Sequence, residues 1–225
     1  MTPDQNGKFI VTTENGNRIY SKKVVLATGA FTPFKKLLPD HHKQLDLTLM
    51  KESVLKVEVK QEDLHKLKTM PSVIYFTGKD ARYDCYILPP ICYDDNKYYI
   101  KIGHGASDSG KLINHQEVMQ WYRDTGSDPV APKLMKTLYN LMPGLKYTSG
   151  VVDHCVSTHT PSNHVMIDEI SKGLTLLIGG CAHAAKSADE IGYEIGYLVA
   201  LTILNDSWSY DIPKHEFTVY FKSSI

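Results

Sequence analysis

The sequence of 225 residues contains no apolar run close to the roughly 20 residues that a membrane-spanning helix needs. It also has no excess of charge of one sign, because 25 Lys and Arg residues balance 25 Asp and Glu residues. A neutral chain lacks the broad basic surface that is typical of nucleic-acid-binding proteins. Its start, MTPDQNGKF, is polar and lacks the apolar core of a signal peptide. We therefore expect a globular protein with neither a membrane nor a nucleic acid as partner.

Cysteine is also scarce. The four cysteines, Cys85, Cys92, Cys155 and Cys181, form no CxxC pair, which indicates free thiols in a reducing compartment such as the cytoplasm. The C-terminal residues SSI differ from the SKL-type peroxisomal signal, so a peroxisomal location is the weaker expectation. The sequence also lacks the dinucleotide fingerprint GxGxxG, a Walker motif and HExxH. In GHGASDSG, residues 103–110, the glycine spacing does not suit a phosphate-binding loop.

What the chain does contain is a series of short strands rich in β-branched and aromatic residues. The pattern predicts strands at 8–13, 18–20, 47–60, 72–78, 84–90 and 97–103, with a turn at Asn15–Gly16. The apolar run 24–27, followed by Thr-Gly-Ala, indicates a strand buried on both faces, as in a parallel sheet, and GLTLLIGG, residues 173–180, indicates a second buried strand. Helices are expected at 114–125, 132–142 and 185–204, whereas 61–70 is either a short helix or a loop. The fold class is therefore mixed α/β (α+β), with a large antiparallel part in the middle of the chain.

Residues 153–164, DHCVSTHTPSNH, place His154, His159 and His164 around Cys155. Four such side chains could form a zinc site, but neighbours in a strand point to opposite faces, so His154 and Cys155 would not converge easily. A thiol nucleophile with a histidine base is a second interpretation. A core cysteine with solvent-facing histidines is the third and plainest. The stretch alone leaves all three open.

The second stretch that suggests chemistry is LTLLIGGCAHAAKSADEIG, where a buried strand ends at Gly179–Gly180 and leads into the helix expected at 185–204. The first turn of a helix presents free N–H groups and the positive end of the helix dipole, which suit a phosphate or an anionic flavin. The alternative is a plain strand-to-helix turn that needs two glycines for its geometry.

Taken together, the two stretches resemble the C-terminal signature of FAD-dependent amine oxidases, in the sarcosine oxidase and pipecolate oxidase branch of the D-amino-acid oxidase superfamily. KKVVLATGAFTP is similar to the strand that closes the FAD domain of this family, and KYYIKIGHG is similar to a strand of its substrate domain. The matching segments follow the family's order along nearly the whole chain. The resemblance implies a flavoprotein that oxidises a small amino acid with oxygen.

The resemblance also implies roles for individual residues. Cys155 matches a cysteine that forms a thioether with the flavin, which makes the FAD cofactor covalently attached in that branch. Lys101 matches a lysine over the flavin that promotes the reaction with oxygen, and Lys186 matches a lysine that holds the substrate carboxylate. Tyr86 and His104 lie near the positions of substrate-pocket side chains. The implied flavin-binding segments contain Gly29, Gly179, Gly180, Ala182, His183, Ala184 and Lys186.

Two departures from the family pattern bear on the substrate. Ala182 and Ala184 flank His183, where the family usually has glycine on both sides, and the added methyl groups stand where backbone approaches the flavin. His104 is displaced by one position from the family's histidine, with Gly105 at the matching place. The amine substrate is therefore not fixed by the resemblance.

The largest departure is the missing GxGxxG unit, which binds the ADP half of FAD. The resemblance assigns residues 1–44 and 150–225 to the last part of a doubly wound FAD-binding domain and residues 45–149 to an antiparallel-sheet substrate domain. The chain is then either a fragment of such an enzyme or a non-catalytic homologue that serves as a binding or structural remnant. A parallel sheet without its first strands would expose an edge, which self-association or a partner could cover.

Overall fold

The computed structural model describes residues 2–3, 7–35, 37–38, 43–78, 84–104, 110–124, 129–182, 184, 196–204 and 206–223. The chain forms two compact units. The first unit comprises Met1–Leu49, Ile113–His115 and Ser157–Ile225, and the second comprises Met50–Leu112 and Gln116–Val156. Each unit has its own hydrophobic core.

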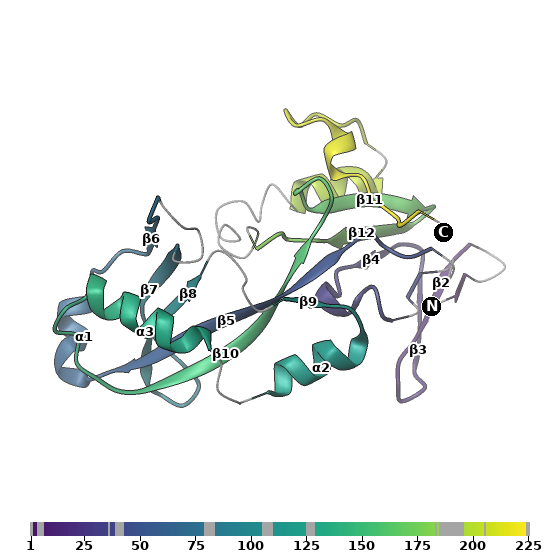
Figure 1. The fold of residues 1–225 in the computed structure, drawn as a ribbon. Coiled ribbons are helices and arrows are strands. Elements are labelled where there is room, and N and C mark those ends of the chain that lie inside the picture. Colours follow the sequence, from purple (N-terminus) through teal and green to yellow (C-terminus); the bar gives the residue numbers. More distant parts are fainter. Residues whose placement is uncertain are drawn as a thin grey trace. The chain divides into compact units, whose positions relative to one another are not determined.

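The second unit is built on a six-stranded sheet. Its strands run in the order β10-β5-β8-β7-β6, and the short β9 pairs with β5 beyond this path (Figure 1). The helices of the same region are α1 (Gln61–Leu67), α2 (His115–Arg123) and α3 (Val130–Leu141). The strands span Thr48–Val59 (β5), Val73–Tyr75 (β6), Cys85–Cys92 (β7), Tyr98–His104 (β8), Lys111–Leu112 (β9) and Tyr147–His159 (β10).

One face of this sheet is apolar and carries the core of the second unit. Alternate residues along each strand point to the same face, so Leu55 and Val57 of β5 lie beside Ile100 and Ile102 of β8. Helix α3 covers them with the stripe Val130, Leu134 and Leu138, which recurs every four residues (Figure 1). The opposite face carries polar side chains and is described with the candidate site.

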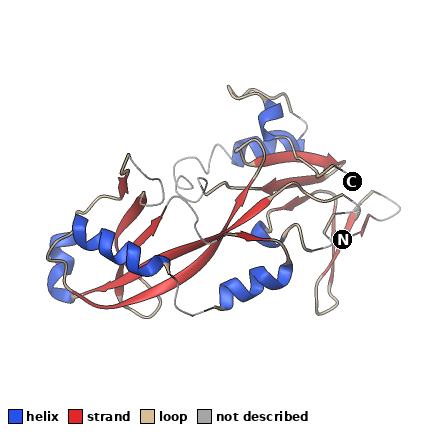
Figure 2. Cartoon of the chain, viewed as in Figure 1, coloured by secondary structure: helices blue, strands red, loops and turns tan. Residues whose placement is uncertain are grey.

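The first unit contains two small sheets, drawn in red in Figure 2. One is antiparallel and consists of β1 (Thr2–Pro3), β2 (Phe9–Thr12) and β3 (Arg18–Ser21). The other has the order β11-β12-β4, with β11 at Met166–Ser171, β12 at Leu174–Ile178 and β4 at Val24–Leu26. Two 3-10 helices, η1 (Gly29–Phe31) and η3 (Lys214–Phe217), and a helical stretch at 196–204 complete the described part of this unit.

The parallel sheet expected at residues 24–27 is confirmed, because β4 pairs parallel with β12, with Leu26 opposite Leu176. The sheet is buried on both faces. Met166 packs into one cluster with Leu174 and Leu176, while the next residue, Ile167, packs on the other side against Leu198 and Phe217. This double burial explains why β12 is apolar without alternation.

The mixed α/β fold expected from the sequence is confirmed, with two refinements. Residues 61–67 form a helix, and β7 continues through Pro89–Pro90 to Cys92. The prolines are tolerated because the pairing with β8 shifts register between Leu88 and Ile91, and β6 pairs only with Cys85–Ile87. Of the helix expected at 185–204, residues 185–195 lie outside the described part. No helix among the described residues is long and apolar enough to cross a membrane.

Truncating the core of the second unit should destabilise the fold strongly. Leu138 is 1 % exposed, whereas Leu204 is 67 % exposed. We expect Leu138→Ala to lower the free energy of unfolding by about 2–5 kcal/mol, since it removes buried methyl groups and leaves a cavity. Leu204→Ala should change it by less than about 0.5 kcal/mol. Urea unfolding followed by circular dichroism compares the two, and equal losses would contradict this assignment of the core.

Candidate active site

The polar face of the second unit's sheet brings several of the predicted site residues together. Residues that are directly opposite each other in neighbouring strands point to the same face. One row of this face consists of Lys56, Lys101 and Leu88, on β5, β8 and β7. The next row consists of Val54, Gly103 and Tyr86 on the same three strands. Lys101 and Tyr86, predicted from sequence positions 15 residues apart, are therefore neighbours on one surface.

Gly103 makes room for the ring of Tyr86. A Cβ atom added at Gly103 would lie 2.6 Å from both Cζ and the hydroxyl oxygen of Tyr86, so the aromatic ring lies directly across the glycine. Covering a strand glycine with an aromatic ring is a known way to fix both in a sheet. Burial is the main cause that raises the pKa of Tyr86 to about 12, with smaller contributions from negative charge at Cys155 and Glu52. The hydroxyl is thus protonated at neutral pH.

Cys155 belongs to the same face through β10, the strand next to β5. On this face, Asp153 of β10 forms an ion pair with Lys56 at 3.2 Å, and Ser149 donates a hydrogen bond to Glu58 at 3.0 Å. Since side chains alternate, Cys155 follows Asp153 on this face in β10, and Glu52 lies on it two positions before Val54 in β5. The free thiol of Cys155 is accessible to solvent.

The charges around Cys155 oppose one another. Partial burial of the sulfur raises the pKa of the thiol most, and the negative charges of Glu52 and Asp153 raise it further, whereas the positive charge of Lys101 lowers it. The net effect is a raised pKa, so the thiol is protonated at neutral pH. Glu52 and Lys101 both act on the charge of the thiol, and Tyr86 responds to the charge at Cys155, so these side chains lie within electrostatic range of one another.

The sequence interpretations of DHCVSTHTPSNH can now be compared with the structure. His154 and Cys155 point to opposite faces of β10, as expected, and His154 stacks on Trp121 with 4.0 Å between the ring centroids. His159 bonds to Ser157 at 2.9 Å, and His164 lies 3.5 Å from Glu216 in the first unit. The histidines therefore do not converge on Cys155. The interpretation of Cys155 as a core cysteine was wrong, because Cys155 is exposed. No group of three or more His, Cys, Asp or Glu side chains suited to a metal ion occurs in the described ranges.

In the first unit, the predicted flavin-binding glycines come to one edge of the parallel strand pair. Gly29 follows the end of β4 by three residues and Gly179 directly follows β12, so both lie beyond the carboxyl ends of the parallel strand pair. Both glycines have positive φ, at 58° and 83°. The carboxyl ends of parallel strands are where α/β folds bind cofactors, and glycine lets a phosphate or a ring approach the backbone closely. These residues fit a dinucleotide such as FAD.

The backbone from Gly179 to Cys181 is packed against and hydrogen-bonded to Thr158 and Thr160. A Cβ atom on Gly179 would lie 2.2 Å from Cγ2 of Thr160, so only glycine fits there. The backbone N–H of Cys181 donates to the carbonyl of Thr158 at 2.9 Å, and the N–H of Ala184 donates to the carbonyl of Gly180 at 3.0 Å. Cys181 and Ala182 both have positive φ, at 48° and 59°, which is costly for residues with a Cβ atom. This junction is thus more constrained than a plain strand-to-helix turn.

Three predicted site residues are not described in full. His183 and Lys186 lie outside the described residues, and for His104 only the backbone is described, paired with Cys85. Their roles stay predictions.

Sequence reasoning missed Glu52, Trp121 and Tyr122. Glu52 could have been found from the two-residue alternation of the strand, which places it on the face of Val54 and Lys56. Burial is the main cause of the raised pKa of Tyr122, and negative charge at Cys155 raises this pKa further. Tyr122 therefore lies near Cys155. No local signal links either aromatic residue of α2 to β10, about 30 residues further along the chain.

Removing the negative charge of Glu52 and removing the positive charge of Lys101 should shift the pKa of the Cys155 thiol in opposite directions. Glu52→Gln removes a negative charge and should lower this pKa, so Cys155 is alkylated faster at a given pH. Lys101→Met removes a positive charge and should raise it, so alkylation slows. Iodoacetamide alkylation between about pH 7 and pH 10, followed by mass spectrometry, measures both shifts. Cys92, an exposed thiol of β7, serves as the internal control. Shifts of the same sign in both variants would contradict this arrangement of charges.

Adding a methyl group at Gly103 should displace Tyr86. We expect Gly103→Ala to lower the free energy of unfolding by about 1–3 kcal/mol, because the new Cβ collides with the ring. Gly150→Ala is the matched control, since its Cβ would meet the flexible end of Met135 at 3.2 Å. In a Tyr86→Ala background the cost of Gly103→Ala should largely vanish. Urea unfolding of the four variants tests this coupling, and fully additive losses would exclude it.

The fold of the chain is shared with oxidases of known structure. A modified fructosyl peptide oxidase from Aspergillus nidulans matches with a TM-score of 0.63 and 18 % identity, covering 97 % of this chain and 49 % of that one. Fructosyl peptide oxidase from E. terrenum matches with a TM-score of 0.59 and 18 % identity, and the match covers 89 % of this chain and 47 % of the oxidase chain. Glycine oxidase from Geobacillus kaustophilus matches with a TM-score of 0.54 and 15 % identity, and the match covers 96 % of this chain and 50 % of the glycine oxidase chain.

At these identities the likeness shows the fold alone, and the chain spans about half the length of the solved structures it matches. No curated protein sequence gives a significant match. The family model described as FAD dependent oxidoreductase (DAO) matches residues 2–198. Because this match covers most of the sequence, the chain belongs to the DAO family of FAD dependent oxidoreductases.

Proposed function

We propose that the chain functions in the FAD-dependent oxidation of the C–N bond of a small amino acid or N-methyl amino acid, of the sarcosine or pipecolate type. The amine CH–NH group would lose two hydrogens to give an imine, and oxygen would take them up as hydrogen peroxide. The observation that carries the proposal is the grouping of Lys101, Tyr86, Glu52 and Cys155 on one sheet face of a DAO family member.

Bound FAD supplies the redox chemistry, by accepting hydride from the carbon next to nitrogen and passing the electrons to oxygen. We propose that the first unit holds part of this cofactor at the edge formed by Gly29, Gly179, Gly180, Ala182 and Ala184. Family membership and the positive-φ glycines beyond the ends of β4 and β12 support this assignment. The second unit is then the substrate domain.

Each described side chain of the polar face has chemistry that suits an amino acid substrate. The carboxylate of Glu52 favours a cationic amine, while Lys101 favours a negative charge. Such a positive charge also stabilises the anion formed when oxygen accepts an electron. Tyr86 keeps its proton at neutral pH and can donate a hydrogen bond to a carboxylate. We propose that Lys186, His183 and His104 complete the set, as the resemblance implies.

Cys155 is our proposed point of flavin attachment. The sulfur of Cys155 would hold the flavin through a thioether to a methyl carbon of the ring, with one hydrogen lost from each partner and oxygen as the two-electron acceptor. Support comes from the exposed, unpaired thiol on the same sheet face as Lys101.

The proposal predicts a yellow protein that produces hydrogen peroxide from an amine. A peroxidase-coupled assay with sarcosine, pipecolate, glycine and fructosyl-valine would identify the substrate class. Lys101→Met should lower the rate of oxygen reaction by about 100-fold, because it removes the charge that stabilises the reduced-oxygen anion. Lys111→Met, at an exposed lysine of β9, should leave the rate unchanged.

A folded, colourless protein that takes up no added FAD would refute the proposal and favour a non-catalytic homologue. Yellow colour that remains in the pellet after acid precipitation, and is lost in Cys155→Ala, would establish the attachment. Colour that stays in solution would refute the attachment alone.

A further inference from the structure

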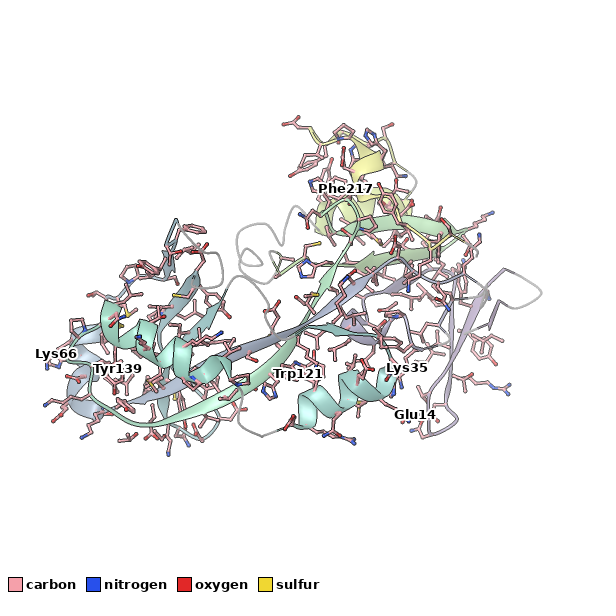
Figure 3. All side chains as sticks on the ribbon, viewed as in Figure 1. Glu14, Lys35, Lys66, Trp121, Tyr139 and Phe217 are labelled. Carbon is pink, nitrogen blue, oxygen red and sulfur yellow. The ribbon has the colours of Figure 1, made fainter. Side chains whose placement is uncertain are left out.

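Trp121 of α2 makes a set of contacts with β10 directly behind Cys155. Its indole N–H donates a hydrogen bond to the backbone carbonyl of Cys155 at 2.9 Å. Its ring stacks on His154, with 4.0 Å between centroids and 18° between planes. The backbone carbonyl of Trp121 lies 3.1 Å from Nδ1 of His154, and the ammonium of Lys51 lies 5.1 Å from the centroid of the indole ring. Figure 3 marks Trp121 beside α2.

The position of β10 at the edge of the sheet explains what these contacts can do. β10 is the terminal strand of the order β10-β5-β8-β7-β6, so backbone groups on its outer side have no neighbouring strand in that sheet. The indole of Trp121 supplies a donor to the backbone carbonyl of Cys155 in this terminal strand. The bond thus holds the edge strand at one residue from the side of α2.

Adjacent residues of β5 and β10 point to opposite faces of the sheet, so the contacts of Trp121 lie directly behind the polar face. Lys51 and His154 contact Trp121 on one face, while the next residues, Glu52 and Cys155, point to the polar face beside Lys101 and Tyr86. A shift of the backbone at residues 154–155 would therefore move the sulfur relative to its charged neighbours.

We infer that Trp121 is a positioning residue that fixes the backbone of Cys155 and so sets the place of the thiol on the polar face. The inference deepens the proposed function, in which Cys155 receives the flavin, but the position of the thiol can be measured without any flavin. Trp121 itself does not contact the reacting atoms.

The test compares two tryptophan variants that each lose an indole hydrogen bond to a backbone carbonyl. Trp121→Phe removes the bond to Cys155, and Trp208→Phe removes the bond to Ile212 in the first unit, which measures 2.8 Å. Alkylation of Cys155 is measured against Cys92 in the same molecule by mass spectrometry over a range of pH. Trp121→Phe should speed alkylation of Cys155 about fivefold at neutral pH and shift its pH profile downward, because a released strand reduces the partial burial that raises the pKa of the thiol.

Cys92 should react at an unchanged rate in Trp121→Phe, and Trp208→Phe should leave Cys155 unchanged. Equal Cys155 profiles in the wild type and in a folded Trp121→Phe protein would overturn the inference. An equal increase at Cys92, or an equal effect of Trp208→Phe, would also overturn it, since it would reveal general loosening. If Trp121→Phe does not fold, Lys51→Met provides the milder variant, and a Cys155 profile unaltered by it would count against the inference.

The outcome is separable from that of the proposed function. If the purified protein contains no flavin, the attachment proposal fails while the alkylation profiles still decide the role of Trp121. If flavin occupies Cys155, the fraction of yellow colour retained in the acid pellet replaces alkylation, and Trp121→Phe should lower that fraction whereas Trp208→Phe should not. Equal retention in both variants would overturn the inference.

Discussion

The two-residue repeat of the β-strand is the constraint on which the second unit depends. It sends Leu55 and Val57 of β5 into the core beneath α3, and it sends Val54 and Lys56 to the polar face. The same alternation separates His154 from Cys155 on β10. A sheet with one buried face has its register fixed by that burial, because a one-residue slip would place charges in the core. The hydrophobic core therefore also sets the geometry of the candidate active site.

In the proposed function, the first unit brings its backbone close to a large cofactor. β4 and β12 are parallel, so their carboxyl ends meet at one edge, and Gly29 and Gly179 follow these strand ends. Thr160 fills the space that a side chain at residue 179 would need. The positive φ of Cys181 and Ala182 costs free energy, which the buried Cys181 and its bond to Thr158 offset. Strain of this kind is expected where a site demands a particular backbone path.

The sequence alone could predict elements whose signal is local. The apolar run Val24–Ala27 indicated a strand of a parallel sheet, GLTLLIGG indicated a buried strand, and the opposite faces of His154 and Cys155 followed from strand geometry. Gly103 looked like part of a poor phosphate loop, whereas its reason is the ring of Tyr86 on the neighbouring strand. Glu52 and Trp121 escaped notice because their importance depends on which strands are adjacent. Strand order and the packing of α2 are decided by contacts between distant segments, and no single stretch encodes them.

The balance of charge at Cys155 indicates what the surrounding structure must supply. Glu52 and Asp153 disfavour the thiolate, burial disfavours it more, and Lys101 alone favours it. A sulfur held in this way reacts slowly by itself at neutral pH, since the thiolate is the nucleophile. Bond formation at such a thiol must gain its rate from placement of the reacting atoms rather than from a permanently ionised sulfur. Placement in turn requires a fixed backbone, and at the edge of the sheet the contacts of Trp121 with Cys155 and His154 provide it.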